Sequence, residues 1–549
     1  MPRNPNSKQH KVRVLAQYPR AIVHLRDQRK NHRLGLVVGA GLSKWFNIPD
    51  WLTLVNLLAS DPKVNGTEIL EGSKRYGLPY KTELLFQHFR RNERTRLRGV
   101  CTDREFSMDV EAKWRQLLKK YLYKGAQEVT SETIRKHPYL ASVLRLVREV
   151  EVTVTYNFDD VLERALYRSR APDQKESSRG YVTISSSAFQ LRGRGRGPVI
   201  YHPNGLIPRA HLMESPSDRL IFSEHAYADH VMDFLSGDHS RLITYLADHT
   251  CLLVGLSLDD QGVRNLLRQS AKINPGNYHY QVRYVTGRSR INEAERYATI
   301  QTNFHIYNLI TLFLDDQQIA ALAELVSMDD EEFDDFAESN GIQTKFLYYL
   351  TGPLGVGKST AITALSCLST FDEWVEPRIS VLAKPWPQLS KRERAEADRW
   401  IARQFKLKND NVRKKKSGLF VLDRGPLDPV AFTVKQSWKK KAKSLLSSIC
   451  PSPSNWSIQP GCVVLMIGDH EEMSLRLRLT SRNWKPMLLQ RMQADLKKAY
   501  GDTNIVPIDT TGLSPAQVVQ RIAHLIHLEN YNEANLHERL NDIMRRGAA

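Results

Sequence analysis

Cysteine is scarce in this chain, and no two cysteines lie close together. Five cysteines occur among 549 residues, and none belongs to a CxxC pair. A zinc site built from cysteine pairs is therefore not expected, and because three of the five lie in apolar runs we expect reduced, buried thiols. No run of 18 or more apolar residues occurs, so no membrane span is expected. The first eight residues contain no apolar signal-peptide core, and the expected location is the cytoplasm.

Acidic residues are also fewer than basic residues, 60 against 79. The formal net charge is +19 and the isoelectric point is about 9.6, which raises the question of a nucleic-acid partner. Basic clusters occur at 192–196, 413–416 and 439–443, but they lack interleaved aromatic residues and accompany no helix-turn-helix or zinc-finger spacing. Solvated loops, or attraction of anionic nucleotides, explain them as well, and nucleic acid is the less favoured partner.

The order of apolar and polar segments predicts an α/β protein with two parallel sheets. Short apolar strands alternate with helical stretches in two blocks, which is typical of parallel sheets. In the first block the expected strands are 34–38, 150–155, 199–201, 251–254 and 280–285. In the second they are 348–351, 419–422, 462–467 and 505–508.

The composition between and around these blocks suggests the domain limits. We expect a loosely held basic arm at 1–32, a first domain at 33–327, a second domain at 344–530 and a C-terminal tail helix at 531–549. Residues 328–343 are sharply acidic in a basic protein, and they fit either an exposed linker or a strap that docks on a basic face.

The second block opens with a complete phosphate-binding loop. The apolar run before Gly352 leads into Gly-Pro-Leu-Gly-Val-Gly-Lys-Ser-Thr, which fits the Walker A pattern at every required position. Its glycines let the backbone N–H groups turn toward a phosphate, and the following helix adds its positive end. Lys358 is expected to reach the β- and γ-phosphates, and the Ser359 hydroxyl to complete a Mg²⁺ shell. The residues assigned to nucleotide binding are Gly352, Gly355, Gly357, Lys358, Ser359 and Thr360.

In the first block, polar residues follow the apolar strands. Strand 34–38 runs into Gly39-Ala40-Gly41-Leu42-Ser43, and strand 150–155 into Tyr156-Asn157-Phe158-Asp159-Asp160. Later come Tyr201-His202-Pro203-Asn204-Gly205 and Gly255-Leu256-Ser257-Leu258-Asp259. Open α/β sheets hold their ligands at these carboxyl ends of strands. The alternatives are purely structural roles, which are a tight turn for the glycines and turn capping for Asn157 and Asp159.

The order and spacing of these pieces resemble the sirtuin-like domains of bacterial defence proteins, over about residues 33–310. The resemblance implies an NAD-binding fold that breaks the nicotinamide–ribose bond and, in defence members, depletes cellular NAD. It implies that Asn157 holds the ribose or the attacking water and that Asp159 anchors ribose hydroxyls or orients Asn157. It also implies the remaining NAD-binding set, which is Gly39, Ala40, Gly41, Ser43, Asn204, Gly255 and Ser257.

One position departs from that family pattern. Sirtuin-like domains usually carry the histidine that acts as general base directly before the glycine of the third motif, and here that position is Asn204. His202 lies two residues earlier, so on a strand it would share a face with Asn204. His202 is therefore the candidate base, with a structural histidine as the alternative.

The second block resembles thymidylate kinases and deoxynucleoside kinases over about residues 345–528. Beyond the phosphate-binding loop, the resemblance implies an acidic catalytic or Mg²⁺-linked residue at Asp423, with Arg424 on the acceptor side. Arg476 and Arg482 are candidates for a lid that closes on phosphates, unless they are merely solvated. No Asn-Lys-x-Asp guanine motif appears, which disfavours a GTPase.

These assignments lead to one main hypothesis and two alternatives. The main hypothesis is an antiphage effector that hydrolyses NAD and is regulated by a domain that binds ATP or dATP with Mg²⁺, in a homo-oligomer by analogy with such effectors. Nucleotides or deoxynucleotides would be its trigger or substrate. The second hypothesis is a P-loop phosphotransferase whose first domain only binds NAD or ADP-ribose, with Asn204 as its best support. The third, supported only by net charge, is an ATP-using nucleic-acid-binding protein.

Overall fold

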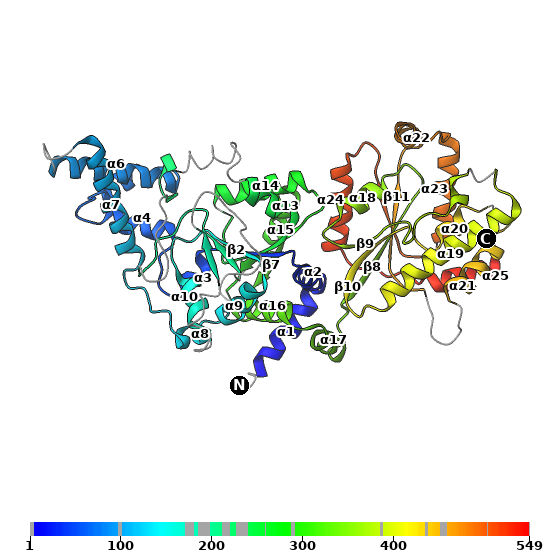
Figure 1. The fold of residues 1–549 in the computed structure, drawn as a ribbon, viewed down its shortest axis with the longest axis horizontal. Coiled ribbons are helices and arrows are strands. Elements are labelled where there is room, and N and C mark those ends of the chain that lie inside the picture. The colour runs from blue at the N-terminus through cyan, green and yellow to red at the C-terminus, as the bar shows by residue number, and fades with distance from the viewer. Residues whose placement is uncertain are drawn as a thin grey trace. The chain divides into compact units, whose positions relative to one another are not determined.

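The computed structural model describes residues 5–96, 102–170, 181–184, 198–210, 220–226, 240–258, 260–286, 291–384, 388–433, 437–450, 458–501 and 503–547. The basic cluster at 192–196 and Asp259 lie outside these residues. The chain divides into two compact units (Figure 1). Unit 1 comprises 1–14, 28–273 and 278–328, and unit 2 comprises 15–27, 274–277 and 329–549.

Unit 1 is built on a seven-stranded, wholly parallel sheet. The strand order is β3-β4-β2-β1-β5-β6-β7, so the chain leaves β1 on one side and returns to β5 on the other. Such a reversal beside the first strand is a topological switch point, where open α/β sheets place their ligands. The strands are β1 (Leu34–Val38), β2 (Val152–Thr155), β3 (Val182–Ile184), β4 (Val199–Tyr201), β5 (Thr250–Val254), β6 (His279–Tyr284) and β7 (Leu309–Leu314).

Most of these strands are buried along their whole length, which explains their continuous apolar sequences. All residues of β1, β5 and β7 are buried, as parallel strands covered on both faces require. The helices of unit 1 are α3 (Ala40–Lys44), α4 (Trp51–Ala59), α5 (Thr67–Gly72), α6 (Leu78–Arg96), α7 (Asp103–Leu122), α8 (Ser131–Lys136), α9 (Leu140–Glu149), α10 (Val161–Arg168), α13 (Ser240–Asp248), α14 (Gln261–Ile273), α15 (Glu293–Tyr307) and α16 (Asp316–Ser327).

Unit 2 has its own parallel sheet, with the phosphate-binding loop after the central strand. The strand order is β12-β11-β8-β10-β9, so β8 is flanked by strands that come later in the chain. The strands are β8 (Lys345–Thr351), β9 (Ser369–Phe371), β10 (Gly418–Asp423), β11 (Cys462–Ile467) and β12 (Ile505–Asp509). The helices are α17 (Asp330–Ser339), α18 (Lys358–Ala364), the 3-10 helix Ser380–Ala383, α19 (Lys391–Arg413), α20 (Asp428–Ala431), α21 (Trp438–Ile449), α22 (His470–Leu479), α23 (Pro486–Tyr500), α24 (Pro515–His527) and α25 (Leu536–Arg546).

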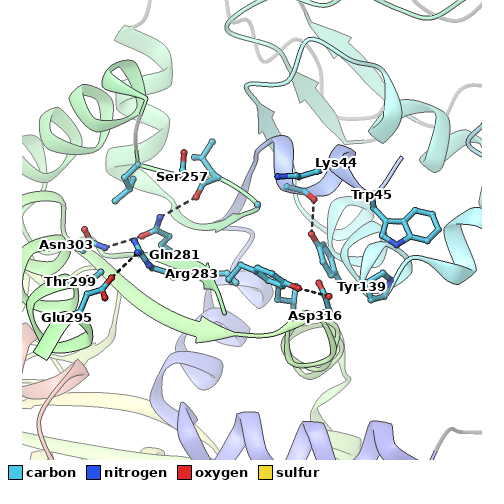
Figure 2. Close-up of a pocket in the computed structure, with 18 of the residues that line it drawn as sticks. Lys44, Trp45, Tyr139, Ser257, Gln281, Arg283, Glu295, Thr299, Asn303 and Asp316 are labelled. Atoms are coloured by element: carbon cyan, nitrogen blue, oxygen red, sulfur yellow. Dashed lines mark hydrogen bonds and ion pairs between the residues drawn. The ribbon is translucent and has the colours of Figure 1, made fainter. Parts of the chain in front are cut away.

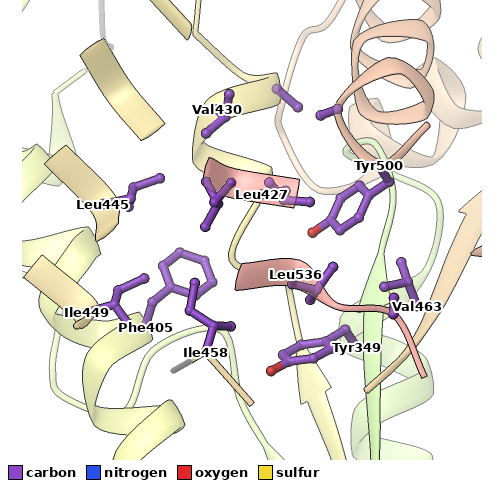
Figure 3. Packing of buried hydrophobic residues seen from close by; sticks show 14 of the residues in the cluster. Tyr349, Phe405, Leu427, Val430, Leu445, Ile449, Ile458, Val463, Tyr500 and Leu536 are labelled. Atoms are coloured by element: carbon purple, nitrogen blue, oxygen red, sulfur yellow. The ribbon is translucent and has the colours of Figure 1, made fainter. Parts of the chain in front are cut away.

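A large apolar core beside this sheet fixes the position of β8 and β10. It brings together Tyr349 of β8, Phe405 of α19 and Leu427 after β10 (Figure 3). The predicted tail helix at 531–549 contributes to the same core, because Leu536 and Leu540 of α25 are fully buried in it. The expected α/β fold with two parallel sheets is therefore confirmed.

The N-terminal segment differs from the expected loose arm. Residues 1–32 contain two helices, α1 (Pro5–Gln17) and α2 (Pro19–Lys30), and Ile22 and Leu25 of α2 are fully buried. Apolar residues three apart on a helix share a face, so this short stripe can be buried even in a mostly polar and basic segment.

The acidic segment 328–343 is largely helical. Most of it lies in α17, and within unit 2 the Arg26 guanidinium is 3.0 Å from the Asp330 carboxylate. Arg26 is 2% exposed and lies over the Phe333 ring at 4.0 Å from its centroid. Within unit 2, this part of the acidic segment therefore packs against Arg26.

Candidate functional site

At the switch point of unit 1, the turn after β1 and the turn after β5 approach each other very closely. The Gly39 amide donates to the Val254 carbonyl (3.0 Å), and the Gly41 amide donates to the Gly255 carbonyl (2.9 Å). A Cβ atom on Gly39 would lie 2.4 Å from that Gly255 oxygen, so no larger residue fits there. Gly255 has φ +68°, a conformation that favours glycine. The glycines predicted to bind a dinucleotide thus also hold the two turns together.

Asn157, Ser43 and Asp159 form one hydrogen-bonded network beside this crossing. The Ser43 hydroxyl donates to Asp159 Oδ1 (2.8 Å), and the Asn157 amide nitrogen donates to Ser43 Oγ (3.1 Å) and to the Gly39 carbonyl (3.2 Å). Because a carbonyl can only accept, the amide nitrogen of Asn157 must point toward Gly39. The amide oxygen of Asn157 is therefore the atom left to meet a ligand.

Asp159 anchors this network from a buried position. It is 4% exposed, and its Oδ1 also accepts from the Val161 amide at 3.0 Å. Burial raises the pKa of Asp159 to about 6, against the lowering effect of its bonds from Ser43 and Val161. At neutral pH Asp159 is ionised and holds Ser43 in the orientation that receives the Asn157 amide.

Two adjoining cavities open at this end of the sheet. The smaller, of about 680 Å³, is lined by Asn157, Asp159 and Asn204, and the larger has a volume of about 1000 Å³. Both volumes suit small-molecule ligands. Five residues line both cavities, namely Gly41, Lys44, Gly255, Leu256 and Ser257.

The larger cavity carries an ordered set of polar side chains that the sequence analysis did not assign (Figure 2). Gln281 of β6 donates to the Leu256 carbonyl (3.4 Å) and accepts from Asn303 of α15 (3.1 Å). Nearby, the Tyr284 hydroxyl donates to Asp316 (2.9 Å). The strand at 280–285 was predicted, but the partners of its side chains on α15 and α16 could not be read from the sequence.

Lys44 is a second residue that the sequence analysis missed. It extends from α3 at the boundary of the two cavities, its side chain is 73% exposed, and its ammonium lies 3.8 Å from Asp50. A lysine just after a glycine-rich turn is a weak signal in a basic chain. Its place between two cavities is what marks it as a candidate for phosphate binding.

His202 lies behind the site and lines neither cavity. Its Nε2 is 2.6 Å from Glu163 Oε1, and both side chains are fully buried. Its Nδ1 is 3.0 Å from the Asn157 carbonyl, so Nδ1 must carry a proton. Burial alone would lower the pKa of His202, but the Glu163 carboxylate raises it above its ordinary value. This geometry couples His202 to the backbone of Asn157 rather than to the cavity.

Most of the other residues predicted to bind NAD line the smaller cavity, but Ser43 does not. Asn204 is 8% exposed and lines the smaller cavity, while Ser43 is 1% exposed and is used inside the network. The predicted residues that line the smaller cavity are Gly39, Ala40, Gly41, Asn157, Asp159, Asn204, Gly255 and Ser257.

In unit 2 the phosphate-binding loop has the backbone that its glycines predicted. Gly352, Gly355 and Gly357 all have positive φ, of 153°, 78° and 99°. The Lys358 ammonium folds back and donates to the carbonyls of Gly352 (2.9 Å) and Pro353 (2.8 Å). Burial lowers the pKa of Lys358 to about 7. A bound phosphate would replace these neutral acceptors with a full negative charge.

Asp423 and Ser359 meet beside this loop and fit a magnesium-bound nucleotide. The Ser359 hydroxyl is 3.4 Å from Asp423 Oδ2, and Asp423 Oδ1 is buried without a hydrogen-bond partner in the described part of the chain. Hydroxyl and carboxylate oxygens are the ligands that Mg²⁺ prefers. Thr360 is exposed at the start of α18.

The arginines predicted near the phosphates occupy three different settings. Arg424 has φ +69°, is 8% exposed, and binds Glu373 (2.7 Å). Arg476 contacts Glu472 (2.5 Å) and the Thr510 carbonyl (3.3 Å), while Arg482 is exposed. Among the described residues, no hydrogen bond or ion pair joins Arg476 or Arg482 to the phosphate-binding loop.

Comparisons with known proteins gave the following matches. Residues 151–309 match the model of the SIR2-like domain family. A tunicamycin resistance protein from Deinococcus radiodurans is similar in structure, with 19% identity and a TM-score of 0.24 over 34% of this chain and 98% of that chain. The thymidylate kinase of Candida albicans is similar with 15% identity and a TM-score of 0.25, over 35% of this chain and 98% of that chain. A search of curated proteins found no match.

Residues 151–309 therefore match a SIR2-like domain, within the range in which the sequence predicted one, and unit 2 carries the predicted phosphate-binding loop. Among the residues that the structure describes, no helix is long and apolar enough to cross a membrane. Within the same residues, no group of three or more histidine, cysteine or acidic side chains is arranged to hold a metal ion.

Proposed function

We propose that the SIR2-like domain hydrolyses NAD at the nicotinamide–ribose bond, as an antiphage effector that depletes cellular NAD. The observation that carries this proposal is the Asn157–Ser43–Asp159 network at the edge of a cavity at the switch point. The adenosine half of NAD would occupy the larger cavity, and Lys44 between the cavities would meet the diphosphate.

The reaction needs little help at its leaving group. The C–N bond breaks with its electron pair going to the nicotinamide ring, whose positive charge is thereby neutralised. Water then forms the new bond to the ribosyl carbon and releases one proton to solvent. The products are nicotinamide, ADP-ribose and a proton.

The role of Asn157 is to stabilise and direct this water attack. Because both amide hydrogens of Asn157 are held by Gly39 and Ser43, its amide oxygen is presented to the ligand. A fixed oxygen dipole favours positive charge on the ribose and accepts a hydrogen bond from the attacking water. The ionised Asp159 keeps Ser43, and through it Asn157, in this orientation.

The P-loop domain would regulate this activity by binding ATP or dATP with Mg²⁺. Lys358 and the loop amides would hold the phosphates, and Ser359 with Asp423 would hold the metal, which neutralises phosphate charge when bound. A homo-oligomer and a nucleotide or deoxynucleotide trigger belong to the same proposal.

Incubation of the purified chain with NAD tests the proposal directly. Release of nicotinamide and ADP-ribose, measured by chromatography with and without ATP or dATP, is the expected result. Absence of release under all nucleotide conditions would contradict the hydrolase.

A second candidate function is favoured by one observation. Asn204, rather than a histidine, lines the smaller cavity, and no histidine is found among the described residues that line this cavity. In this alternative the SIR2-like domain binds NAD or ADP-ribose without cleaving it, and the P-loop domain is a nucleoside or nucleotide phosphotransferase. Binding of ADP-ribose without nicotinamide release would favour it.

We predict that His202 positions Asn157 and does not act as the general base. His202→Ala should lose about 3–5 kcal/mol of stability, because it leaves Glu163 buried without its partner. The double variant Glu163→Gln/His202→Gln keeps hydrogen-bonding groups without charge, and it should retain nicotinamide release within about tenfold. Thermal unfolding provides the control for folding. A folded double variant with no release would contradict this prediction.

Asp159 should make the stability of the protein depend on pH. With its pKa at about 6, above the ordinary value of 3.8, the folded state binds more protons than the unfolded state between these pH values. Stability from this site therefore falls as pH rises through that window, by up to about 3 kcal/mol. Asp159→Asn should be more stable than wild type at pH 7.5, and its advantage should be about three times smaller at pH 4.5, measured by urea unfolding. An equal difference at both pH values would contradict the pKa shift.

A further inference from the structure

Lys408 of α19 is a buried lysine in unit 2 that the sequence analysis did not assign. It is 1% exposed, and its ammonium lies 4.9 Å from the centroid of the Phe405 ring. Among the residues that the structure describes, Lys408 forms no ion pair with a carboxylate. A lysine is rarely buried in this way, because removal of its charge from water costs free energy. The groups that it does bind indicate its role.

The Lys408 ammonium binds three backbone carbonyls at the carboxyl ends of two strands. It donates to the Asp423 carbonyl (2.7 Å) at the end of β10. It also donates to the carbonyls of Glu373 (3.2 Å) and Asp372 (3.5 Å), which follow β9. An ammonium has three N–H donors, so all of them are used. Because β9 and β10 pair with each other in the sheet, Lys408 holds the ends of two neighbouring strands together.

One of these bonds fixes the peptide between Asp423 and Arg424. The carbonyl of this peptide accepts from Lys408 (2.7 Å), and its N–H donates to the Leu350 carbonyl of β8 (2.9 Å). Arg424 has φ +69°, which is uncommon for a residue other than glycine. Such a backbone conformation persists when its surroundings hold it from several sides. The two bonds therefore stabilise this turn and fix the directions in which the side chains of Asp423 and Arg424 leave the backbone.

The two side chains fixed in this way have separate partners near the phosphate-binding loop. The Asp423 carboxylate meets the Ser359 hydroxyl (3.4 Å), and its Oδ1 is buried without a hydrogen-bond partner among the described residues. The Arg424 guanidinium binds Glu373 (2.7 Å), whose own carbonyl is another acceptor of Lys408. One ammonium thus holds the backbone of both Asp423 and Glu373.

We propose that Lys408 is a positioning residue for the metal of a bound nucleotide: its ammonium fixes the peptide between Asp423 and Arg424 and thereby holds the Asp423 carboxylate beside Ser359. The inference rests on the proposed binding of a nucleotide with Mg²⁺ at the adjacent loop. It adds to that site a residue that acts through Asp423 rather than by contact with the ligand.

Calorimetric titration of the full chain with ADP, in Mg²⁺ and in EDTA, tests this role. We define the magnesium gain as the Kd for ADP in EDTA divided by the Kd in Mg²⁺. The gain should be at least about tenfold for wild type and below about threefold for Lys408→Met, which has a neutral side chain of similar length. The Kd in EDTA should change by less than about threefold, because Lys358 and the loop amides remain. Lys391→Met, at an exposed position of the same helix, is the matched control and should keep the wild-type gain.

Two other roles of Lys408 would give different results. If the ammonium acted only through its charge, its removal would leave the site more negative, so the magnesium gain would rise and ADP would bind more weakly in EDTA. If it served only the stability of the fold, thermal unfolding would shift and the gain would stay at the wild-type value. Either result would overturn the proposal.

A second variant serves if Lys408→Met does not fold. Lys408→Gln keeps two N–H donors on a side chain that is one atom shorter, so it cannot hold all three carbonyls. It should lower the magnesium gain by at least about threefold, because the hydrogen bonds that position the Asp423 peptide are weakened. An unchanged gain in this variant would also overturn the proposal.

Failure of this inference can be distinguished from failure of the proposed nucleotide site. The wild-type titrations report on that site alone. If wild type binds ADP with a magnesium gain and the Lys408 variant keeps the same gain, the proposed site stands and the role of Lys408 falls. If wild type does not bind ADP, or binds it without a gain, the proposed nucleotide or Mg²⁺ site fails and the inference falls with it.

Discussion

Asn157→Ala is expected to reduce nicotinamide release by about 100-fold or more. The substitution removes the amide oxygen that faces the cavity, and removal of one preorganised polar group from a transition-state site typically has an effect of this size. The fold should survive, because the Ser43–Asp159 hydrogen bond and the glycine crossing do not need the Asn157 side chain. Release of nicotinamide from NAD at saturating substrate is the measurement.

The matched control is another asparagine of unit 1 that binds backbone carbonyls. Asn92 donates to the carbonyls of Lys63 and Val64 at 3.2 Å and lies outside both cavities. Asn92→Ala should leave nicotinamide release unchanged. If Asn157→Ala is folded by circular dichroism and releases nicotinamide at the wild-type rate, Asn157 has no catalytic role and the hydrolase proposal loses its main support.

The strands that the sequence predicted are those whose burial produces a continuous apolar run bounded by turn residues. Strands β3 and β9 were missed because each has only three residues and lies at or near a sheet edge. Strand β7 was missed although five of its six residues are apolar, because it follows α15 after the single residue Asn308. That residue has φ +50°, so it ends the helix without the glycine or proline that marks most turns.

The candidate sites were predictable wherever the backbone itself forms them. The glycines of the two turns and of the phosphate-binding loop have few alternatives at positive φ or at close approach, and their spacing is visible in the sequence. The pairing of Glu163 with His202 was not predictable, because it joins side chains of α10 and of the segment after β4.

The position of His202 shows how a sequence rule can mislead. Residues two apart on a strand share a face, but β4 ends at Tyr201, so that rule does not extend to His202 and Asn204. Beyond the strand the backbone turns, so the side chains of His202 and Asn204 no longer share a face. Asn204 lines the cavity, and His202 is buried against Glu163.

Lys358→Ala is expected to weaken nucleotide binding by about 10- to 100-fold. In the structure the Lys358 ammonium is held by two neutral carbonyls, and burial lowers its pKa to about 7, so a phosphate is a better partner than its present ones. Loss of a hydrogen bond to a charged group is typically worth about 1.5–3 kcal/mol, which corresponds to this range of affinity. Binding of fluorescent ADP in the presence of Mg²⁺ measures it. Lys345→Ala, at the opposite end of β8, is the control and should bind ADP as wild type does.

The same substitution tests whether the two domains form one regulated effector. If nucleotide binding at the P-loop controls NAD cleavage, Lys358→Ala should change nicotinamide release across titrations of ATP and dATP, although Lys358 and Asn157 belong to different units. The sign of the change reports whether the nucleotide holds the enzyme on or off, since a ligand shifts a conformational equilibrium only toward the state that it binds more tightly. Identical release by wild type and Lys358→Ala at every nucleotide concentration would mean two tethered, independent activities. We expect a change, because a hydrolase that consumes NAD must be restrained until its trigger arrives.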